Sequence, residues 1–579
     1  MGHLRTAAAS SPLAAKRRAG LGRVPLFGVA SLGIVAIVSL LVLLPTASIF
    51  YGSLRSEADQ VSLTLANWAT VYLGPSYRGP FLNTVILSVV VASICVVLGT
   101  GMAWVVARTD APGRRALSLL LYLPVMVSPL ITALAWVALA APAAGFLNAG
   151  IHALFPGVQT AFNIYSLPGV VFVMVLHYAP YAYLAAFVAM RGLDASLEDA
   201  SYVLGAGPLT TARRMTLPLI TPALASGALL TFVFVAENFS VPTMLGTPVG
   251  YNTLPSSLYF DLNVAPAHPG LAAAAGTMLL ALGLLGTVVQ RRLTARGRRY
   301  VTIGGKGGRP RLVRLGRLRY LASGLCLLYL VLAIFLPYAA LVAGSFMQYV
   351  TSTITPTLFT TSNYTELASS QYLSPIENTL LLSVIGGFAA SLFYVVVSYF
   401  VIRARTRTRV VLDYLTIAPT AIPAMVLAIG LLWAFVSLPL PVYGTLWILG
   451  LAYITKYLGY GVRQTTSSMV QISAELEEAA RVSGADALRA FRDIVFPIVR
   501  PAFLSLWMLL LILFSVEVSS TILLYSPNTE TATVLLWNQL ANGATTTAFA
   551  IAVLQATAVF AILLLLSRVF GTTWMRGGE

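Results

Sequence analysis

The chain has 579 residues, of which 58% are hydrophobic and only 9% charged, and its mean hydropathy is +0.84. So few charged side chains are too few to solvate a globular protein of this length, which excludes an aqueous globular fold and predicts a polytopic membrane protein. The apolar runs are continuous, without an alternation of period two, so they exclude a transmembrane β-barrel and predict an all-α fold.

The formal net charge of +17 would also suit a nucleic-acid-binding protein, but the basic residues follow a topological pattern instead. Of the 36 Lys and Arg residues, only Arg55 and Arg78 fall in loops that we place outside, and Lys456 lies within or beside a span. The remaining 33 fall in tails and loops of one side, which the positive-inside rule assigns to the cytoplasm. We therefore expect a lipid bilayer around the chain, both termini in the cytoplasm and no nucleic-acid partner.

Hydropathy predicts twelve spans, each long enough for the ~20 apolar residues that cross a bilayer. They lie near 27–50, 81–107, 117–141, 166–190, 219–245 and 269–289, and then near 321–346, 377–402, 413–436, 442–462, 499–525 and 544–570. The first run is too long for a signal peptide and has no convincing cleavage site, so we expect it to stay uncleaved. The predicted regions are a basic cytoplasmic tail (1–26), a first repeat (27–289), a basic Gly-rich cytoplasmic linker (290–320), a second repeat (321–570) and a cytoplasmic tail (571–579).

The two sets of six spans repeat one another in sequence. The matched positions are Asn67 with Asn363, Asn83-Thr84 with Asn378-Thr379, Pro124 with Pro419, and Trp136 with Trp433. Because each set has an even number of spans, both copies share one orientation, and we predict a pseudo-twofold axis along the membrane normal. Prolines inside the spans, including Pro180 and Pro242, predict kinked helices whose freed carbonyls find partners on neighbouring helices or in water.

Two polar segments, 196–222 and 475–501, interrupt the apolar pattern between the fourth and fifth span of each set. They align at an offset of 279 residues, which matches Asp199 with Glu478, Gly205 with Gly484 and Pro218 with Pro497. In each we predict a short helix that ends at the glycine in a left-handed turn, and a second helix that stops at the proline. The result is an elbow across the membrane surface whose charged face has no partner within this chain.

The second elbow reads Glu478-Ala479-Ala480, Gly484, Ile494 and Phe496-Pro497, and this spacing resembles the loop motif of permease subunits of ATP-binding cassette importers. The first copy departs more, with Asp199-Ala200-Ser201, Gly205, Met215 and Leu217-Pro218. The resemblance implies that each loop seats in a cleft of a cytoplasmic ATPase, in two copies. It also implies that Asp199 and Glu478 face basic residues of that partner, and that ATPase closure rocks six helices against six in alternating access.

This chain has no phosphate loop of its own. Gly304-Gly305-Lys306-Gly307 lacks the preceding glycine, since Tyr300 stands there, and Gly307 stands where Ser or Thr should follow the lysine. We therefore expect no enzymatic activity and no cofactor in this chain, with ATP hydrolysis on the separate ATPase subunit.

The fused twelve-span form and three segments resemble the permeases of ferric-iron importers. These segments are Leu176–Tyr181, Val442–Trp447 and Leu523–Thr531. The resemblance implies ferric iron as the substrate, delivered to the outer loops by an extracytoplasmic binding protein. Permeases for phosphonate, thiamine, polyamine and sugar uptake share much of the pattern, so these substrates stay open as alternatives.

Ionisable residues inside spans are costly, which makes Glu237 and Glu517 the candidate pathway residues. They could contact a hard cation such as ferric iron or serve a proton or water chain at a gate; the alternatives are a hydrogen bond to a neighbouring helix or an interfacial position. His177 and Lys456, which we place near the inner ends of spans four and ten, are weaker candidates. There a lysine can snorkel to the cytoplasmic surface and a histidine can satisfy a helix contact.

Two observations bound the remaining alternatives. Cys95 and Cys326 lie inside apolar runs, so we expect neither a disulfide nor a thiolate metal site, and no metal ligand is assigned. A major-facilitator-type transporter would also have twelve spans, but its loop motif matches poorly at Asp110–Arg115, and it would leave both elbows unexplained. A permease-like receptor or regulator without transport also stays open.

Overall fold

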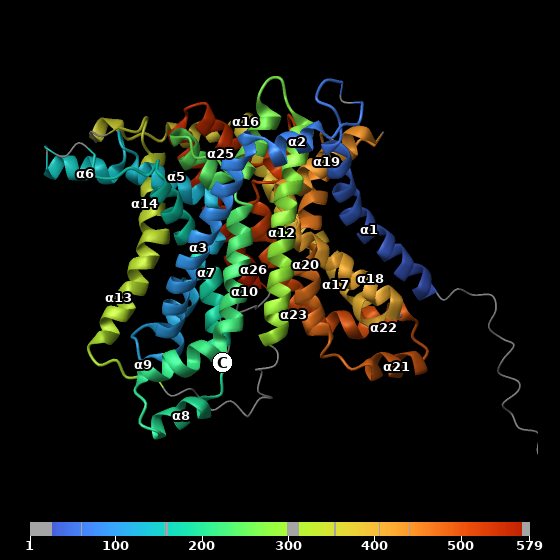
Figure 1. The fold of residues 1–579 in the computed structure, drawn as a ribbon. Coiled ribbons are helices and arrows are strands. Elements are labelled where there is room, and N and C mark those ends of the chain that lie inside the picture. The colour runs from blue at the N-terminus through green and yellow to red at the C-terminus, as the bar shows by residue number, and fades with distance from the viewer. Residues whose placement is uncertain are drawn as a thin grey trace, which may run out of the picture.

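The computed structural model describes residues 26–59, 61–155, 157, 160–297, 312–351, 355–404, 406–438 and 440–569. Every regular element in these ranges is a helix, and the long helices form one bundle (Figure 1), so the all-α membrane fold is confirmed. The structural predictions for residues 1–25 of the N-terminal tail (1–26), for residues 298–311 of the linker (290–320) and for the C-terminal tail (571–579) fall outside the described residues.

Among the described residues, nine helices are long and apolar enough to cross a membrane. In the first half they are α1 (Leu26–Ser53), α3 (Pro75–Arg108), α7 (Leu167–Arg191), α10 (Leu217–Ala236) and α12 (Pro269–Gly297). In the second half they are α13 (Leu318–Leu330) with α14 (Leu336–Ser345), α16 (Ser370–Leu380) with α17 (Gly387–Arg403), α23 (Phe496–Ser515) and α26 (Thr545–Val569).

The remaining three predicted spans take other forms. The third span of each half is bent. Helix α4 (Arg114–Leu120), taken with the turn that continues it to Met126, meets α5 (Pro129–Ala140) at 94°. Helix α18 (Thr406–Ile417), taken with the turn that continues it to Ala421, meets α19 (Ala424–Ser437) at 109°. Prolines lie at both breaks, as predicted, because a proline ring cannot continue the helical hydrogen-bond ladder. The tenth span is α20 (Leu446–Met469), whose polar residues keep it out of the apolar set although its 24 residues suffice to cross a bilayer.

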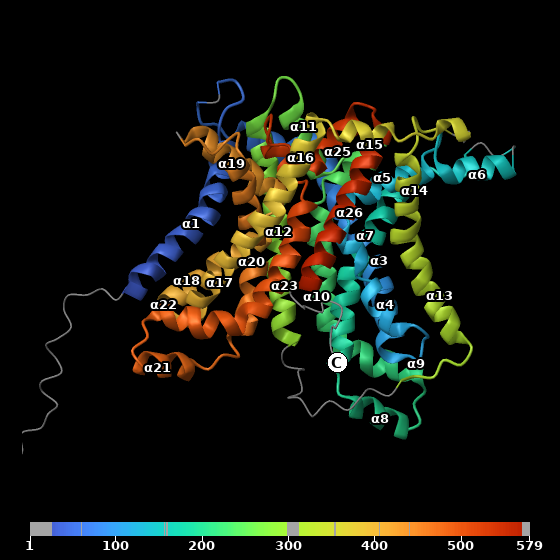
Figure 2. The same cartoon turned by 180° about the vertical axis from the view of Figure 1, so that it is seen from behind.

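Short helices occupy the two ends of the bundle. At one end lie α8 (Ala195–Val203), α9 (Pro208–Thr211), α21 (Ala474–Val482) and α22 (Ala487–Ala490). At the opposite end lie α2 (Ala66–Leu73), α6 (Phe146–Leu154), α11 (Leu254–Asn263), α15 (Ser362–Leu367) and α25 (Ala532–Ala541), as Figures 1 and 2 show. A further short helix, α24 (Thr521–Leu524), follows α23 inside the bundle. The two polar segments thus share one end of the molecule.

The prediction that Pro218 and Pro497 end a surface helix was wrong. The helix that follows each elbow continues into the span, over Pro208–Ala236 and Leu488–Ser515. A π turn precedes each proline, at Ala212–Thr216 and Phe491–Val495. The wider turn accommodates the missing proline N–H, so the chain passes from the membrane surface into the span without a stop.

The first span of each half packs against the bent span of the other half. Helix α1 lies along α18 and α19, whereas α14 lies along α5. The α1/α19 contact is close, since a Cβ atom on Gly430 would lie 2.1 Å from the carbonyl oxygen of Pro45. Pro180 leaves the carbonyl of Leu176 without its helical donor, and the hydroxyl of Tyr329, on α13 of the second half, donates to it at 2.7 Å. Each half therefore supplies packing contacts, and the second half supplies a hydrogen bond, that the other half needs.

Hydrogen bonds repeat between the halves at the predicted matched positions. Asn67 Nδ2 donates to the carbonyls of Ser53 and Arg55 at the end of α1, and Asn363 Nδ2 donates to those of Ser345 and Met347 at the end of α14. Likewise Thr84 Oγ1 accepts from the first N–H of α11, and Thr379 Oγ1 from that of α25. A duplicated sequence accounts for such paired contacts.

Candidate functional site

The two elbows have the left-handed glycine turns that the sequence predicts. Gly205 has φ +83° and Gly484 has φ +90°, a region that side chains with a Cβ seldom enter. In each turn the following N–H closes the end of the helix, from Ala206 to the Ser201 carbonyl at 3.1 Å and from Ala485 to the Ala480 carbonyl at 3.0 Å. These bonds fix the direction in which each elbow leaves the membrane surface.

The start of each elbow helix is capped by a polar side chain. Asp194 accepts the backbone N–H of Ser196 at 2.9 Å, and hydrogen bonds from Ser196 hold the pKa of Asp194 below its ordinary value. Ser473 Oγ accepts the N–H of Glu475 at 3.3 Å at the start of the second elbow. Both helices therefore begin at defined residues.

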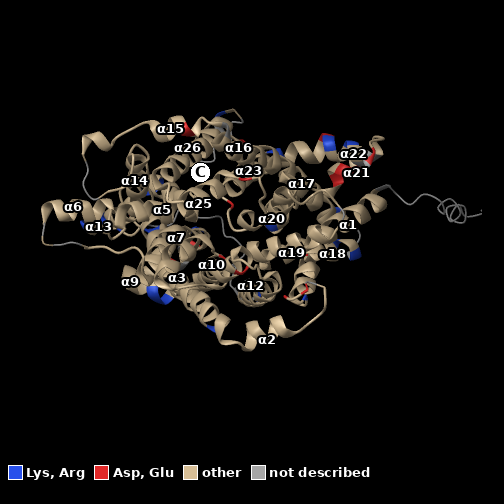
Figure 3. Ribbon diagram, turned by 90° about the horizontal axis from the view of Figure 1, so that it is seen from above, with Lys and Arg blue, Asp and Glu red and all other residues tan. Residues whose placement is uncertain are grey.

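The residues expected to meet a partner are exposed on both elbows: Asp199 and Ala200 on α8, and Glu478 and Ala479 on α21. Large apolar side chains are exposed beside them at positions that match at the same offset. These are Val203 (86% exposed) with Val482 (89%), and Leu209 (80%) with Leu488 (73%). Seen from above, the charged residues of α21 and α22 lie at the periphery of the bundle (Figure 3). The elbows thus present a mixed acidic and apolar surface away from the core.

Sequence reasoning missed a second acidic residue in each elbow. Glu198 and Glu477 precede the exposed acids and are buried. Glu198 lies 3.2 Å from Arg108 Nη1, and Glu477 lies 2.7 Å from Arg403 Nε. The signal was available, because the two glutamates match at the offset of 279 and each arginine is the last residue of the second span of its half.

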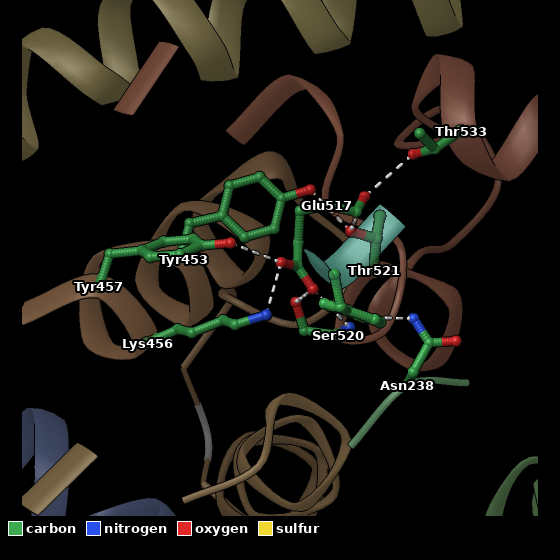
Figure 4. Close-up of polar contacts among 9 residues, drawn as sticks. Asn238, Tyr453, Lys456, Tyr457, Glu517, Ser520, Thr521 and Thr533 are labelled. Carbon is green, nitrogen blue, oxygen red and sulfur yellow. Dashed lines mark hydrogen bonds and ion pairs between the residues drawn. The ribbon is translucent and has the colours of Figure 1, made fainter. Parts of the chain in front are cut away.

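Glu517 lies where the helix breaks between α23 and α24, and Figure 4 shows the groups around it. Its Oε2 accepts from Lys456 Nζ at 2.7 Å and from the hydroxyl of Tyr457 at 2.9 Å. Its Oε1 accepts from the N–H and the hydroxyl of Ser520 at 3.2 and 3.1 Å. All of these partners come from the second half, so the carboxylate is fully held by its own repeat.

Lys456 and His177 were placed incorrectly. Each lies near the middle of its helix, α20 or α7, rather than at the inner end. Lys456 is an ion-pair partner of Glu517 and does not snorkel to the surface, because a buried ammonium group is stable only beside a counter-charge. His177 is buried, its ring contacts Tyr178 edge to face at 4.7 Å, and its Nδ1 has no hydrogen-bond partner among the described residues.

Glu237 lies at the end of α10 and reaches across to the other half. Its carboxylate interacts with the backbone N–H of Ala424, the first residue of α19, and it is near enough to Lys456 and Glu517 to interact with both electrostatically. A helix start favours such a carboxylate, because its first N–H groups have no helical acceptors. An acid of the first half thus lies near the ion pair of Lys456 and Glu517.

The first half contains a neutral counterpart of the Glu517 cluster. At the offset of 279, Asn238 matches Glu517, and Tyr178 matches Tyr457. Asn238 Nδ2 donates to the hydroxyl of Tyr178 at 2.8 Å, and its Oδ1 accepts the N–H of Val241 at 3.0 Å, as Glu517 accepts that of Ser520. We did not single out Asn238 from the sequence, although the repeat spacing points to it.

No group of three or more His, Cys, Asp or Glu in the described ranges could hold a metal ion. Cys95 and Cys326 are both buried and free.

The chain matches the family described as "Binding-protein-dependent transport system inner membrane component" over residues 95–299 and 384–574. It is 26% identical to the ferric transport system permease protein FbpB of Actinobacillus pleuropneumoniae, over 94% of this chain and 78% of that protein. It is 28% identical to the putative 2-aminoethylphosphonate transport system permease protein PhnV of Salmonella typhimurium, over 38% of this chain and 84% of that protein. Among solved structures, a bacterial ABC transporter that imports the acidic polysaccharide alginate is similar at a TM-score of 0.40 and 19% identity, over 47% of this chain and 96% of that chain.

Proposed function

The chain belongs to the family of binding-protein-dependent transport system inner membrane components, and from this premise we propose that it forms the translocation pathway of an ATP-driven ferric-iron importer. One observation carries the choice of iron. The similarity to a ferric transport permease extends over 94% of the chain, whereas the similarity to a phosphonate permease covers 38%. As a member of this family the chain is an inner-membrane transport permease.

The elbows are the docking sites for a separate cytoplasmic ATPase, one copy on each. Their exposed acids, Asp199 and Glu478, supply charge for basic residues of the ATPase. The exposed apolar side chains at matched positions, such as Val203 and Val482, supply surface that gains free energy when a partner covers it. The end of the bundle that carries both elbows, together with both termini, is then cytoplasmic.

The opposite end of the bundle receives an extracytoplasmic binding protein. Its short helices, including α2, α11 and α25, cap the spans there and form the docking surface. Substrate released by that protein enters between the two halves. Alternating access follows when ATPase closure at the elbows rocks one half against the other.

Glu237 and Glu517 act at a gate in this pathway, and they act differently. Glu517 is neutralised by Lys456 and held by Tyr457, so it stabilises the break between α23 and α24 and does not coordinate iron. Glu237 lies near the other half and has no ion pair among the described residues, so it is the carboxylate available to a passing cation. His177 stays a packing residue.

Reconstitution in proteoliposomes with the cognate ATPase and binding protein tests the proposal. We expect ATP-dependent uptake of labelled ferric iron when the iron-loaded binding protein is outside and ATP is inside. If the binding protein fails to bind iron, the ferric-iron proposal is wrong. Competition by 2-aminoethylphosphonate, thiamine, a polyamine or a sugar would then identify the substrate instead. Uptake driven by a proton gradient without the ATPase would contradict the importer, and binding without any uptake would favour a receptor or regulator.

A further inference from the structure

Each elbow carries two neighbouring acids that face opposite ways. The outer acids, Asp199 and Glu478, are exposed, whereas the inner acids, Glu198 and Glu477, are buried against the bundle. In the proposed function the outer acids serve the ATPase. The inner acids have their partners within this chain and need a different explanation.

The inner acid of each elbow binds an arginine that also holds the end of the fourth span. Arg108 donates from Nη2 to the carbonyl of Met190 at 2.5 Å, near the end of α7. Arg403 donates from Nη2 to the carbonyl of Ile472 at 3.1 Å, just beyond the end of α20. Each guanidinium therefore joins the second span, the fourth span and the elbow helix at a single point.

Hydroxyl groups complete the binding of each buried carboxylate. Thr216 Oγ1 donates to Glu198 Oε1 at 2.9 Å, and Tyr399 donates from its hydroxyl to Glu477 Oε2 at 3.0 Å. Thr216 belongs to the π turn that leads into α10, so the contacts around Glu198 also include the fifth span. Tyr399 lies on α17 with Arg403, and its ring contacts Phe491, in the π turn that leads into α23, edge to face. A charged pair enclosed in this way holds its groups in one geometry, because separating them leaves a buried charge without a partner.

We propose that Arg108 with Glu198, and Arg403 with Glu477, are positioning residues that couple each elbow to the spans. A displacement of α8 then moves α3 and α7 with it, and a displacement of α21 moves α17 and α20. This inference rests on the proposed docking of an ATPase at the elbows. It assigns the exposed acid to partner binding and the buried acid to transmission of the motion.

The test uses the full complex with ATPase and binding protein in proteoliposomes. Glu477→Gln keeps the size of the side chain and removes its charge, and Glu478→Gln is the matched control on the next residue. For Glu477→Gln we expect the ATPase to remain bound while transport per ATP hydrolysed falls about tenfold, within the usual range of coupling between sites. For Glu478→Gln we expect weaker ATPase binding, with normal transport per ATP in the complexes that still form.

A charge exchange separates loss of coupling from loss of folding. Arg403→Glu and Glu477→Arg should each uncouple transport, and the double variant should regain coupling because the pair is restored in reverse. Normal transport per ATP in Glu477→Gln, or a folded double variant as uncoupled as the single variants, would overturn the inference. Failure of the wild-type chain to bind the ATPase would instead overturn the proposed function, so the two failures are distinguishable.

Discussion

The two halves have the same backbone geometry at matched helix breaks, after α10 and after α23, but different charged side chains there. In the second half Tyr457 donates to Glu517, which Lys456 neutralises; in the first half the matched Tyr178 accepts from Asn238, beside His177. At these matched positions the acid and its counter-ion occur together in the second half, and Asn238 and His177 replace both in the first, as expected where a lone buried charge is costly. Both copies therefore keep the shape of the helix break, but the ion pair occurs in the second copy alone, and the acid of the first copy, Glu237, lies one residue earlier.

The largest expected effect comes from breaking the charged copy. We expect Lys456→Met to lower the free energy of unfolding by about 3–5 kcal/mol, because it leaves Glu517 as a buried carboxylate without its counter-ion. Denaturant unfolding in detergent micelles measures this. The matched control, His177→Met, should cost less than about 1 kcal/mol, since His177 forms no ion pair with any described residue. Equal losses in the two variants would show that the charge pair has no special role.

The contact of α1 with α19 gives the next largest effect. We expect Gly430→Ala to cost about 1–3 kcal/mol, because its Cβ would meet the backbone of Pro45, which has little room to move. Gly33→Ala on α1 is the control, since nothing lies within 4 Å of its added Cβ. The matched residue of α5, three positions before its tryptophan, is already Ala133. Thermal unfolding measures both variants, and equal melting temperatures for Gly430→Ala and Gly33→Ala would contradict the expected clash with Pro45.

Substitutions can give the Asn238 cluster of the first half the charges of the Glu517 cluster of the second half. We expect Asn238→Asp to lower stability by about 1–3 kcal/mol, because it buries a carboxylate with hydrogen-bond donors but no counter-ion. Adding His177→Lys should recover part of the loss if the two breaks are equivalent. Unfolding of the single and double variants measures the coupling. A double variant less stable than Asn238→Asp alone would show that the two helix breaks are equivalent in backbone shape but not in side-chain environment.

The two elbows should differ in a smaller way. The second copy keeps the family pattern more closely, so we expect Glu478→Lys to weaken ATPase binding about tenfold, or ~1.4 kcal/mol, and Asp199→Lys to weaken it less. Titration of the purified ATPase onto the chain in nanodiscs measures both. A larger loss for Asp199→Lys would reverse the proposed order of the elbows.

The smallest effect concerns Asp261 on α11, which accepts from the hydroxyl of Tyr77 at 2.8 Å. Burial raises the pKa of Asp261 to about 6. Folding therefore favours the protonated acid, and stability falls as the pH rises from about 4 to about 6. Gln539 is the eighth residue of α25, as Asp261 is of α11, so we expect Asp261→Gln to stabilise the chain at neutral pH by less than about 1 kcal/mol and to change little at pH ~4. Unfolding at both pH values measures this, and a gain at low pH alone would contradict it.

The sequence predicts features that depend on local pattern. Apolar runs predict the spans, the glycines at 205 and 484 predict the elbow turns, and the prolines predict the bent third spans. It failed where a contact between distant residues decides the outcome. A lysine in an apolar run indicates a cost but not its partner, so Lys456 was assigned to the surface when Glu517 was its counter-ion. Similarly, Pro497 looks like a stop because the π turn before it has no sequence signature that we recognised.

The bond between Tyr329 and the carbonyl of Leu176 has a consequence for the order of assembly in the membrane. When α7 first inserts, Pro180 has already left that carbonyl without a donor, and its donor lies on α13, beyond the linker. Helix α1 likewise waits for α19 before Pro45 gains its close contact with Gly430. The first half thus enters the bilayer before its contacts with the second half can form. If the chain were cut at the linker, the two halves would have to associate in the membrane before these contacts could form.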